Sequence, residues 1–244
     1  MSGAVPALDE DFHVHSTFSA DGASTIGENV AVAARRGLRT LCLAEHVRSA
    51  CTHARELSAA AAQLPRPPGL RILTGVEAKI LDMTGRLDLP ADLGGIDLVL
   101  IADHQFPADL GPVEPALMRG EIAAGEVRVR DVIDCLTEAT ANAAGLGSGA
   151  VIAHMFSVLP KMGLSEDDVP DSQLDWLAAR IAAAGPAVEI NEKWRCPGPR
   201  AALALARAGA RLVAGSDSHH CRDIGRYVSV RQTSDAVLAG ARSR

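Results

Sequence analysis

Most of the histidines in this chain stand at the ends of short apolar runs, and this placement points to chemistry. Each run that resembles a buried strand is closed or followed by an imidazole or a carboxylate. The residues placed in this way are His13, His15, His46, Glu77, His104, His154, Asp217 and His219. Imidazole nitrogens and carboxylate oxygens without thiolates suit Zn²⁺, Mn²⁺ or Fe²⁺. Because these ligands outnumber what one tetrahedral ion needs, the sequence predicts two or three divalent metal ions.

A single histidine near a strand end is more often a hydrogen-bonded structural residue than a metal ligand. Here six of the eight histidines share the position, and the two in HVH, His13 and His15, point to the same face of a strand. Such a gathering of polar groups is costly to desolvate unless a cation accompanies it. His53 and His220 lie away from the strand ends, so we expect them to be exposed or to make supporting contacts.

These side chains need a scaffold that brings strand ends together. Short apolar runs alternate with Ala-rich amphipathic segments along the chain. We expect strands at 11–15, 40–45, 72–78, 98–102, 150–153, 187–191 and 211–215. We expect helices at 26–36, 54–63, 129–143, 172–184 and 199–208. The less periodic stretch 106–125 contains three prolines, and we expect it to form a long loop over the site.

The alternation of strands and helices predicts an α/β protein with a parallel sheet, and about seven units favour a barrel over an open sheet. The carboxyl ends of the strands in such a barrel meet at one rim, where active sites are built. No linker of domain size and no repeat interrupts the sequence. We therefore expect one barrel domain over residues 1–244.

Composition narrows the function classes. Hydrophobic residues make up 48% of the 244 residues, and the net charge of −6 argues against binding to long nucleic acids but not to a small anion. The five cysteines form no CxxC pair, which favours reduced thiols. We find neither a signal peptide nor an apolar run of ~18 residues, so we expect a cytoplasmic protein without membrane spans. The sequence does not determine the oligomeric state.

The motifs DFHVHSTFSADG, LAEH, GVE, ADH, IAH and GSDSH follow one another in this order. In this respect the chain resembles the PHP (polymerase and histidinol phosphatase) family, and the resemblance extends from His13 to His219. It implies a distorted (β/α)7 TIM-like barrel, the PHP fold, with a trinuclear metal centre. Members of the family are typically phosphoesterases, histidinol-phosphate phosphatase among them.

The resemblance also assigns ligands residue by residue. The pair His13 and His15 matches the opening HxH, Asp21 matches the ligand that follows it, and Glu77 matches the carboxylate that bridges two metals. The full set of implied metal ligands is His13, His15, Asp21, His46, Glu77, His104, His154, Asp217 and His219. A glutamate, Glu45, precedes His46 where the family usually has aspartate, and this departure leaves the ligand itself unchanged.

The segment EINEKWR resembles the substrate side of the histidinol-phosphatase branch. Glu189, Asn191 and Arg195 match the positions of that branch, with Asn191 and Arg195 on the substrate, and a guanidinium such as that of Arg195 suits a phosphate. Glu192 and Lys193 depart from the small residues usual there. Arg195 fits equally well as a surface arginine before a Pro–Gly turn.

We therefore expect a metal-dependent phosphatase whose substrate is a small phosphorylated metabolite, histidinol phosphate or a similar monoester. In the expected mechanism a hydroxide that bridges the metals attacks phosphorus, while Glu77 holds the metals together. Arg195 neutralises charge on the phosphoryl oxygens, and the leaving alcohol takes a proton from Asp217, His219 or His154.

Other activities on the same metal centre stay open, namely hydrolysis of a cyclic phosphate, a nucleotide diester or an amide-type bond. Amidohydrolases also begin with an HxH motif, but a carboxylated lysine commonly bridges their metals where Glu77 stands here. A metal-binding scaffold without activity is a further alternative. Exonuclease action on long DNA is disfavoured because few basic residues lie near the expected rim.

Overall fold

The structure, a computed structural model, describes residues 5–242. Its central feature is a sheet of seven parallel strands in the order β1-β2-β3-β4-β7-β8-β9. These strands are β1 (Glu10–Val14), β2 (Thr40–His46), β3 (Arg71–Lys79), β4 (Leu98–Ala102), β7 (Ala150–Ile152), β8 (Ala187–Asn191) and β9 (Leu212–Gly215). Each strand pairs with its predecessor along the chain once the small hairpin β5–β6 is set aside.

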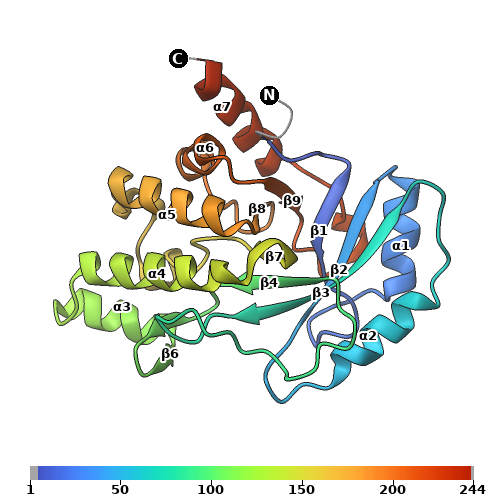
Figure 1. The fold of residues 1–244 in the computed structure, drawn as a ribbon, viewed down its shortest axis with the longest axis horizontal. Coiled ribbons are helices and arrows are strands. Elements are labelled where there is room, and N and C mark those ends of the chain that lie inside the picture. Colours follow the sequence, from blue (N-terminus) through green and yellow to red (C-terminus); the bar gives the residue numbers. More distant parts are fainter. Residues whose placement is uncertain (1–4, 243–244) are drawn as a thin grey trace.

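The sheet curls until its last strand returns to its first (Figure 1). Val14 forms a parallel bridge with Ser218, just beyond β9. The backbone N–H of His15 donates to the carbonyl of Ser218 at 2.8 Å. The result is a nearly closed barrel, which confirms the expected distorted (β/α)7 architecture.

Helices cover the outside of the barrel, with α1 and α2 on one side and α4, α5 and α6 on the other (Figure 1). The α-helices are α1 (Ile26–Arg35), α2 (His53–Ala62), α3 (Pro115–Ala124), α4 (Val129–Ala143), α5 (Asp171–Ala184), α6 (Pro199–Ala208) and α7 (Ser229–Arg242). Four 3-10 helices lie at Ala144–Gly149, Pro160–Met162, Glu166–Asp168 and Cys221–Asp223. Thr25 begins α1 through a reciprocal capping box with Glu28.

Alternation along the strands separates the barrel interior from the two larger clusters that lie beneath the helices. In β2, Leu41 and Leu43 join the cluster beneath α1 and α2, whereas Cys42 and Ala44 join a smaller cluster formed by strands alone. Because successive strand residues point to opposite faces, the smaller cluster is the barrel interior. These side chains fill the interior beneath the carboxyl ends of the strands, and the polar residues occupy the rim.

The expectation of a long loop at 106–125 is wrong. The segment forms a hairpin, β5 (Phe106–Ala108) with β6 (Gly111–Val113), followed by helix α3. Proline is tolerated in so short an edge pair and in the first turn of a helix, where Pro115 stands. The left-handed Gly125, with φ of 74°, ends α3. Pro107 and Pro112 therefore lie opposite each other in the hairpin, and Pro115 marks the start of α3. Helix α7 was not expected either.

None of the helices within residues 5–242 combines the length and apolar character needed to cross a bilayer. All five cysteines are unpaired, as the sequence predicted.

Candidate metal centre

The first strand and the residue that follows it bring two buried imidazoles close together. His13 lies in β1 and His15 directly follows it, and both are fully buried. Their Nε2 atoms are 3.0 Å apart, and each lies 3.4 Å from Oε2 of Glu77. Three ligand atoms from β1 and β3 therefore surround one point at the rim of the barrel.

Glu77 is the centre of the arrangement and is only 1% exposed. Its Oε1 lies 2.9 Å from Nε2 of His104 and 2.7 Å from Nε2 of His154. Its Oε2 lies 2.8 Å from Nδ1 of His46, but this approach lacks hydrogen-bond geometry, and no described residue donates a hydrogen bond to that oxygen. A buried carboxylate oxygen of this kind, facing several imidazole nitrogens, fits a divalent cation.

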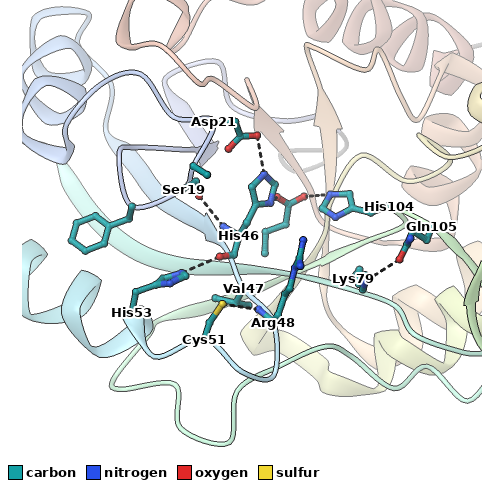
Figure 2. A pocket seen from close by; sticks show the side chains of 13 residues that line it. Ser19, Asp21, His46, Val47, Arg48, Cys51, His53, Lys79, His104 and Gln105 are labelled. Atoms are coloured by element: carbon teal, nitrogen blue, oxygen red, sulfur yellow. Dashed lines mark hydrogen bonds and ion pairs between the residues drawn. The ribbon is translucent and has the colours of Figure 1, made fainter. Parts of the chain in front are cut away.

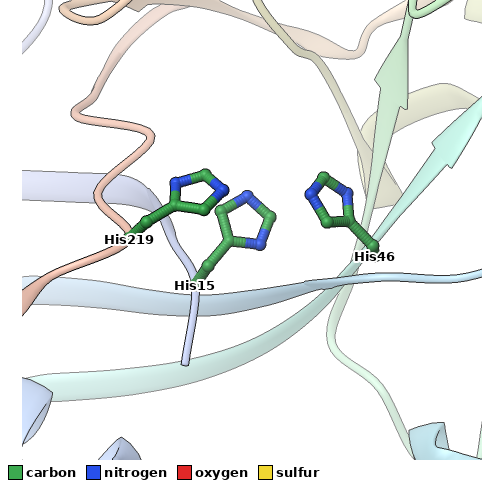
Figure 3. A group of neighbouring side chains, drawn as sticks. All are labelled: His15, His46 and His219. Carbon is green, nitrogen blue, oxygen red and sulfur yellow. The ribbon is translucent and has the colours of Figure 1, made fainter. Parts of the chain in front are cut away.

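A second group of imidazoles lies nearer the surface. His15, His46 and His219 come from three different loops or strand ends and turn their rings toward a shared space (Figure 3). Asp21, in the loop after β1, lies 3.1 Å from Nε2 of His219 and 3.4 Å from Nε2 of His46. His46 and His219 are partly exposed, with 37% and 20% of their side-chain surface accessible, whereas His15 is buried like the group around Glu77.

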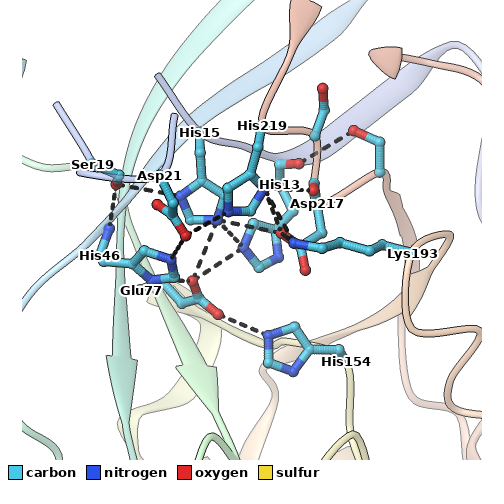
Figure 4. Close-up of polar contacts among 12 residues, drawn as sticks. His13, His15, Ser19, Asp21, His46, Glu77, His154, Lys193, Asp217 and His219 are labelled. Carbon is cyan, nitrogen blue, oxygen red and sulfur yellow. Dashed lines mark hydrogen bonds and ion pairs between the residues drawn. The ribbon is translucent and has the colours of Figure 1, made fainter. Parts of the chain in front are cut away.

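The structure thus brings all nine predicted ligands into one cluster, and Figure 4 labels all of them except His104. Eight of them form overlapping groups whose ligand atoms lie within 4.8 Å of one another. The groups are His15–His46–His219, His13–His154–Asp217, His13–His15–Glu77 and His46–Glu77–His104. Because Glu77, His13, His15 and His46 each belong to two groups, the donor set suits several neighbouring ions that share ligands.

Carboxylates behind the cluster fix the orientation of the imidazoles. Both oxygens of the fully buried Glu189, in β8, lie 3.2 Å from Nδ1 of His13. Ser157 links Asp103 to Nδ1 of His154, with distances of 2.6 and 3.0 Å. Partners of this kind direct the opposite ring nitrogen toward a metal.

Sequence reasoning missed these supporting roles. Glu45 and Asp103 stand directly before a strand-end histidine, which was an available signal. Glu45 accepts hydrogen bonds from Ser16 and Ser19 at 2.5 and 2.6 Å. His53, expected to be exposed or supporting, lies with its Nε2 2.9 Å from the carbonyl of His46.

Burial and mutual charge set the protonation states. Burial lowers the pKa of His15 to about 4, which leaves a neutral imidazole with a free lone pair at neutral pH. Burial alone would raise the pKa of Glu77, but His13 and His104 hold it well below its usual range. Burial also opposes charge on His154, yet Asp103 and Glu77 raise its pKa to about 10. A cation bound at Glu77 would take the place of that proton.

Asp217 occupies a constrained position after β9. Its backbone has a positive φ of 51°, and His154 has a φ of 29°. Such conformations are uncommon outside glycine and gather at functional sites. The Nζ of Lys193 lies 3.3 Å from one carboxylate oxygen of Asp217, and Nε1 of Trp194 donates to the other at 2.8 Å. Both oxygens are therefore held in place.

The predicted substrate residues have different surroundings. Arg195 is exposed, has a φ of 56° and lines neither of the two cavities beside the cluster. Asn191 is buried, donates to Glu189 at 2.9 Å and accepts from the backbone N–H of Trp194 at 2.8 Å. Lys193, which the sequence marked only as a departure, is the cation of this segment that reaches the cluster.

Two cavities flank the cluster. One has a volume of about 700 Å³ and reaches from His46, Glu77 and His104 to Arg48 and Lys79 (Figure 2). The other has a volume of about 600 Å³ and extends along the opposite flank. Its lining includes Asp21, Lys193, Asp217, His219, Arg222 and Arg226. Both volumes are in the range of small-molecule sites.

Comparison with known proteins gives consistent results. The sequence model of the PHP domain matches residues 11–193. A probable phosphatase of Caldanaerobacter subterraneus subsp. tengcongensis is 26% identical over 89% of this chain and 78% of its own length. A probable phosphatase of Shewanella sp. (strain MR-4) is 28% identical over 93% of this chain and 82% of its own length.

A solved structure shares the fold. Histidinol phosphate phosphatase from Lactococcus lactis subsp. lactis Il1403, crystallised with zinc, L-histidinol and phosphate, matches with a TM-score of 0.68. The two chains are 18% identical, and the match covers 94% of this chain and 92% of the other.

Proposed function

The chain belongs to the PHP domain family, and on this basis we propose that it is a metal-dependent phosphatase that hydrolyses a small phosphate monoester. The observation that carries the proposal is the gathering of nine imidazole and carboxylate side chains at the barrel rim, five of them histidines that lie within 3.4 Å of the buried Glu77. Relatives described as probable phosphatases match most of the chain, which supports the same reaction class.

We propose that two or three divalent ions, Zn²⁺, Mn²⁺ or Fe²⁺, bind at this cluster. The nine residues named above, with Glu77 at their centre, would hold these ions. Ions held there would activate water and offset the charge of a phosphoryl group. The protein supplies neutral imidazoles such as His15, whose lone pair is free because its pKa is lowered, and an ionised Glu77.

Substrate handling falls to residues at the rim of the cluster. Lys193 lies 3.2 Å from Nδ1 of His219 and 3.3 Å from Asp217, which places a cation where phosphoryl oxygens would bind. Burial would raise the pKa of Asp217, but His13 and His15 hold it below its usual range. Asp217 therefore stays ionised at neutral pH, which leaves His219 or His154 as the donor of a proton to the leaving alcohol.

The test is metal removal and reconstitution. After EDTA treatment and dialysis, release of 4-nitrophenol from its phosphate should stop, and adding Zn²⁺, Mn²⁺ or Fe²⁺ should restore it. A panel of monoesters that includes histidinol phosphate, together with diesters, cyclic phosphates and lactones, defines the bond that is cleaved. Full activity in metal-free protein, or a clear preference for diesters, would overturn the proposal.

A further inference from the structure

Apart from the proposed metal ligands, the charged residues that line the cavity of about 700 Å³ are all cations. Its charged lining residues, apart from the proposed ligands Asp21 and Glu77, are Arg48 and Lys79. The rest of the lining is histidine, neutral polar or apolar and includes Phe18, Val47, Cys51 and Gln105. A substrate bound over the metals that extends into this cavity meets two cations.

Among the described residues Arg48 has no carboxylate partner, and Lys79 has one long ion pair, with Asp88. The exposed guanidinium of Arg48 forms no ion pair or hydrogen bond with a residue within 5–242. In Figure 2 its side chain extends toward His46 and His104. The Nζ of Lys79 lies 2.8 Å from the neutral Gln105, whereas its nearest carboxylate, Asp88, is 3.9 Å away and lies outside the lining.

We propose that this cavity binds a second anionic group, a phosphate or a carboxylate, on the alcohol part of the phosphomonoester. The inference rests on the proposed function and names its substrate class. In the reaction, the phosphorus–oxygen ester bond breaks, water supplies the new oxygen on phosphorus, and the alcohol leaves with a proton and keeps its anionic group. An alcohol with an ammonium group, as in histidinol, meets repulsion from Arg48 and Lys79.

Four small substrates that share a two-carbon alcohol test the idea on the metal-reconstituted protein. They are 2-phosphoglycolate, ethane-1,2-diol bisphosphate, 2-hydroxyethyl phosphate and O-phosphoethanolamine, with 4-nitrophenyl phosphate as the reference. We expect kcat/KM for the better anionic substrate to exceed that for O-phosphoethanolamine by about tenfold or more, as expected for one charge-assisted hydrogen bond. Comparison of kcat/KM for 2-phosphoglycolate and ethane-1,2-diol bisphosphate shows whether the cavity prefers a carboxylate or a phosphate.

Charge reversal locates the effect. The substitution Arg48→Glu, at an exposed position, should reduce the ratio of kcat/KM for the better anionic substrate to kcat/KM for O-phosphoethanolamine by about tenfold or more. The preference then moves toward the ammonium substrate. The matched control Arg222→Glu makes the same change in the other cavity and should leave the ratio as it is. Lys79→Gln should lower the ratio in the same direction as Arg48→Glu.

The outcomes separate the two proposals. Turnover of 4-nitrophenyl phosphate with equal kcat/KM for the anionic, neutral and cationic substrates would overturn the anionic cavity and leave the phosphatase proposal standing. A ratio that responds to Arg222→Glu and not to Arg48→Glu would also overturn it. Absence of phosphate release from every substrate would overturn both.

Discussion

Replacing Glu189 by glutamine tests whether the carboxylate behind His13 prepares the metal centre. The change preserves shape but removes a charge that is fully buried. Glu189 accepts from His13 Nδ1, from the backbone N–H of His154 at 2.8 Å and from Asn191 at 2.9 Å. The amide NH₂ of glutamine must face one of these donors. Asn191 cannot turn its amide to compensate, because its oxygen already accepts from the backbone N–H of Trp194.

The magnitude follows from these contacts. A buried donor left without an acceptor costs about 1–3 kcal/mol. For a chain of this length, a loss of about 2 kcal/mol lowers the melting temperature by about 4–8 °C. Loss of the partner that orients a ligating histidine typically weakens metal binding by about 10–100-fold. Glu189→Gln should therefore reduce both stability and metal affinity.

Two measurements check this prediction. Competition against a chromophoric chelator gives the Zn²⁺ affinity, and circular dichroism gives the melting temperature. The control variant Glu126→Gln changes an exposed glutamate and should match the wild type in both. If Glu189→Gln binds Zn²⁺ as tightly as the wild type, then the carboxylate does not orient His13 for a metal and the reasoning fails.

Three further predictions follow from the same cluster. EDTA should lower the melting temperature, and added Zn²⁺ should raise it. Free Zn²⁺ at a hundredfold excess over Kd adds about 2.7 kcal/mol to the free energy of unfolding. Identical melting curves would contradict a built metal site. Gly215→Ala should abolish turnover and destabilise the fold, because its Cβ would lie 1.7 Å from Oε1 of the buried Glu189; a wild-type rate would contradict the packing. Lys193→Ala should reduce kcat/KM for 4-nitrophenyl phosphate more than Arg195→Ala does, since Lys193 contacts Asp217 whereas Arg195 lines neither cavity beside the cluster; the reverse order would restore Arg195 as the phosphate residue.

The barrel could be predicted from the sequence because its signals are local. Buried parallel strands are short apolar runs, and α5 and α6 end before Gly185 and Gly209, as the expected helices 172–184 and 199–208 do. The polar residues that close the strands had to meet at one rim once the barrel formed. The hairpin and α3 were missed because proline was interpreted as a sign of irregular structure, although it also begins helices and occupies edge strands.

The proposed ligand set could be predicted from the sequence, since its members lie in or shortly after the apolar strands β1, β2, β3, β4, β7 and β9. The tertiary structure decides what stands behind the ligands. Glu189 contacts His13 across 176 residues of chain, and no local pattern reports a contact of that range. It also decides that Lys193, rather than Arg195, reaches Asp217, because the left-handed backbone at Arg195 lies in a turn whose shape depends on the packing around it. The positions of strand ends follow from the local sequence. Whether Lys193 or Arg195 reaches Asp217 depends instead on how strands that are distant in the sequence close the barrel.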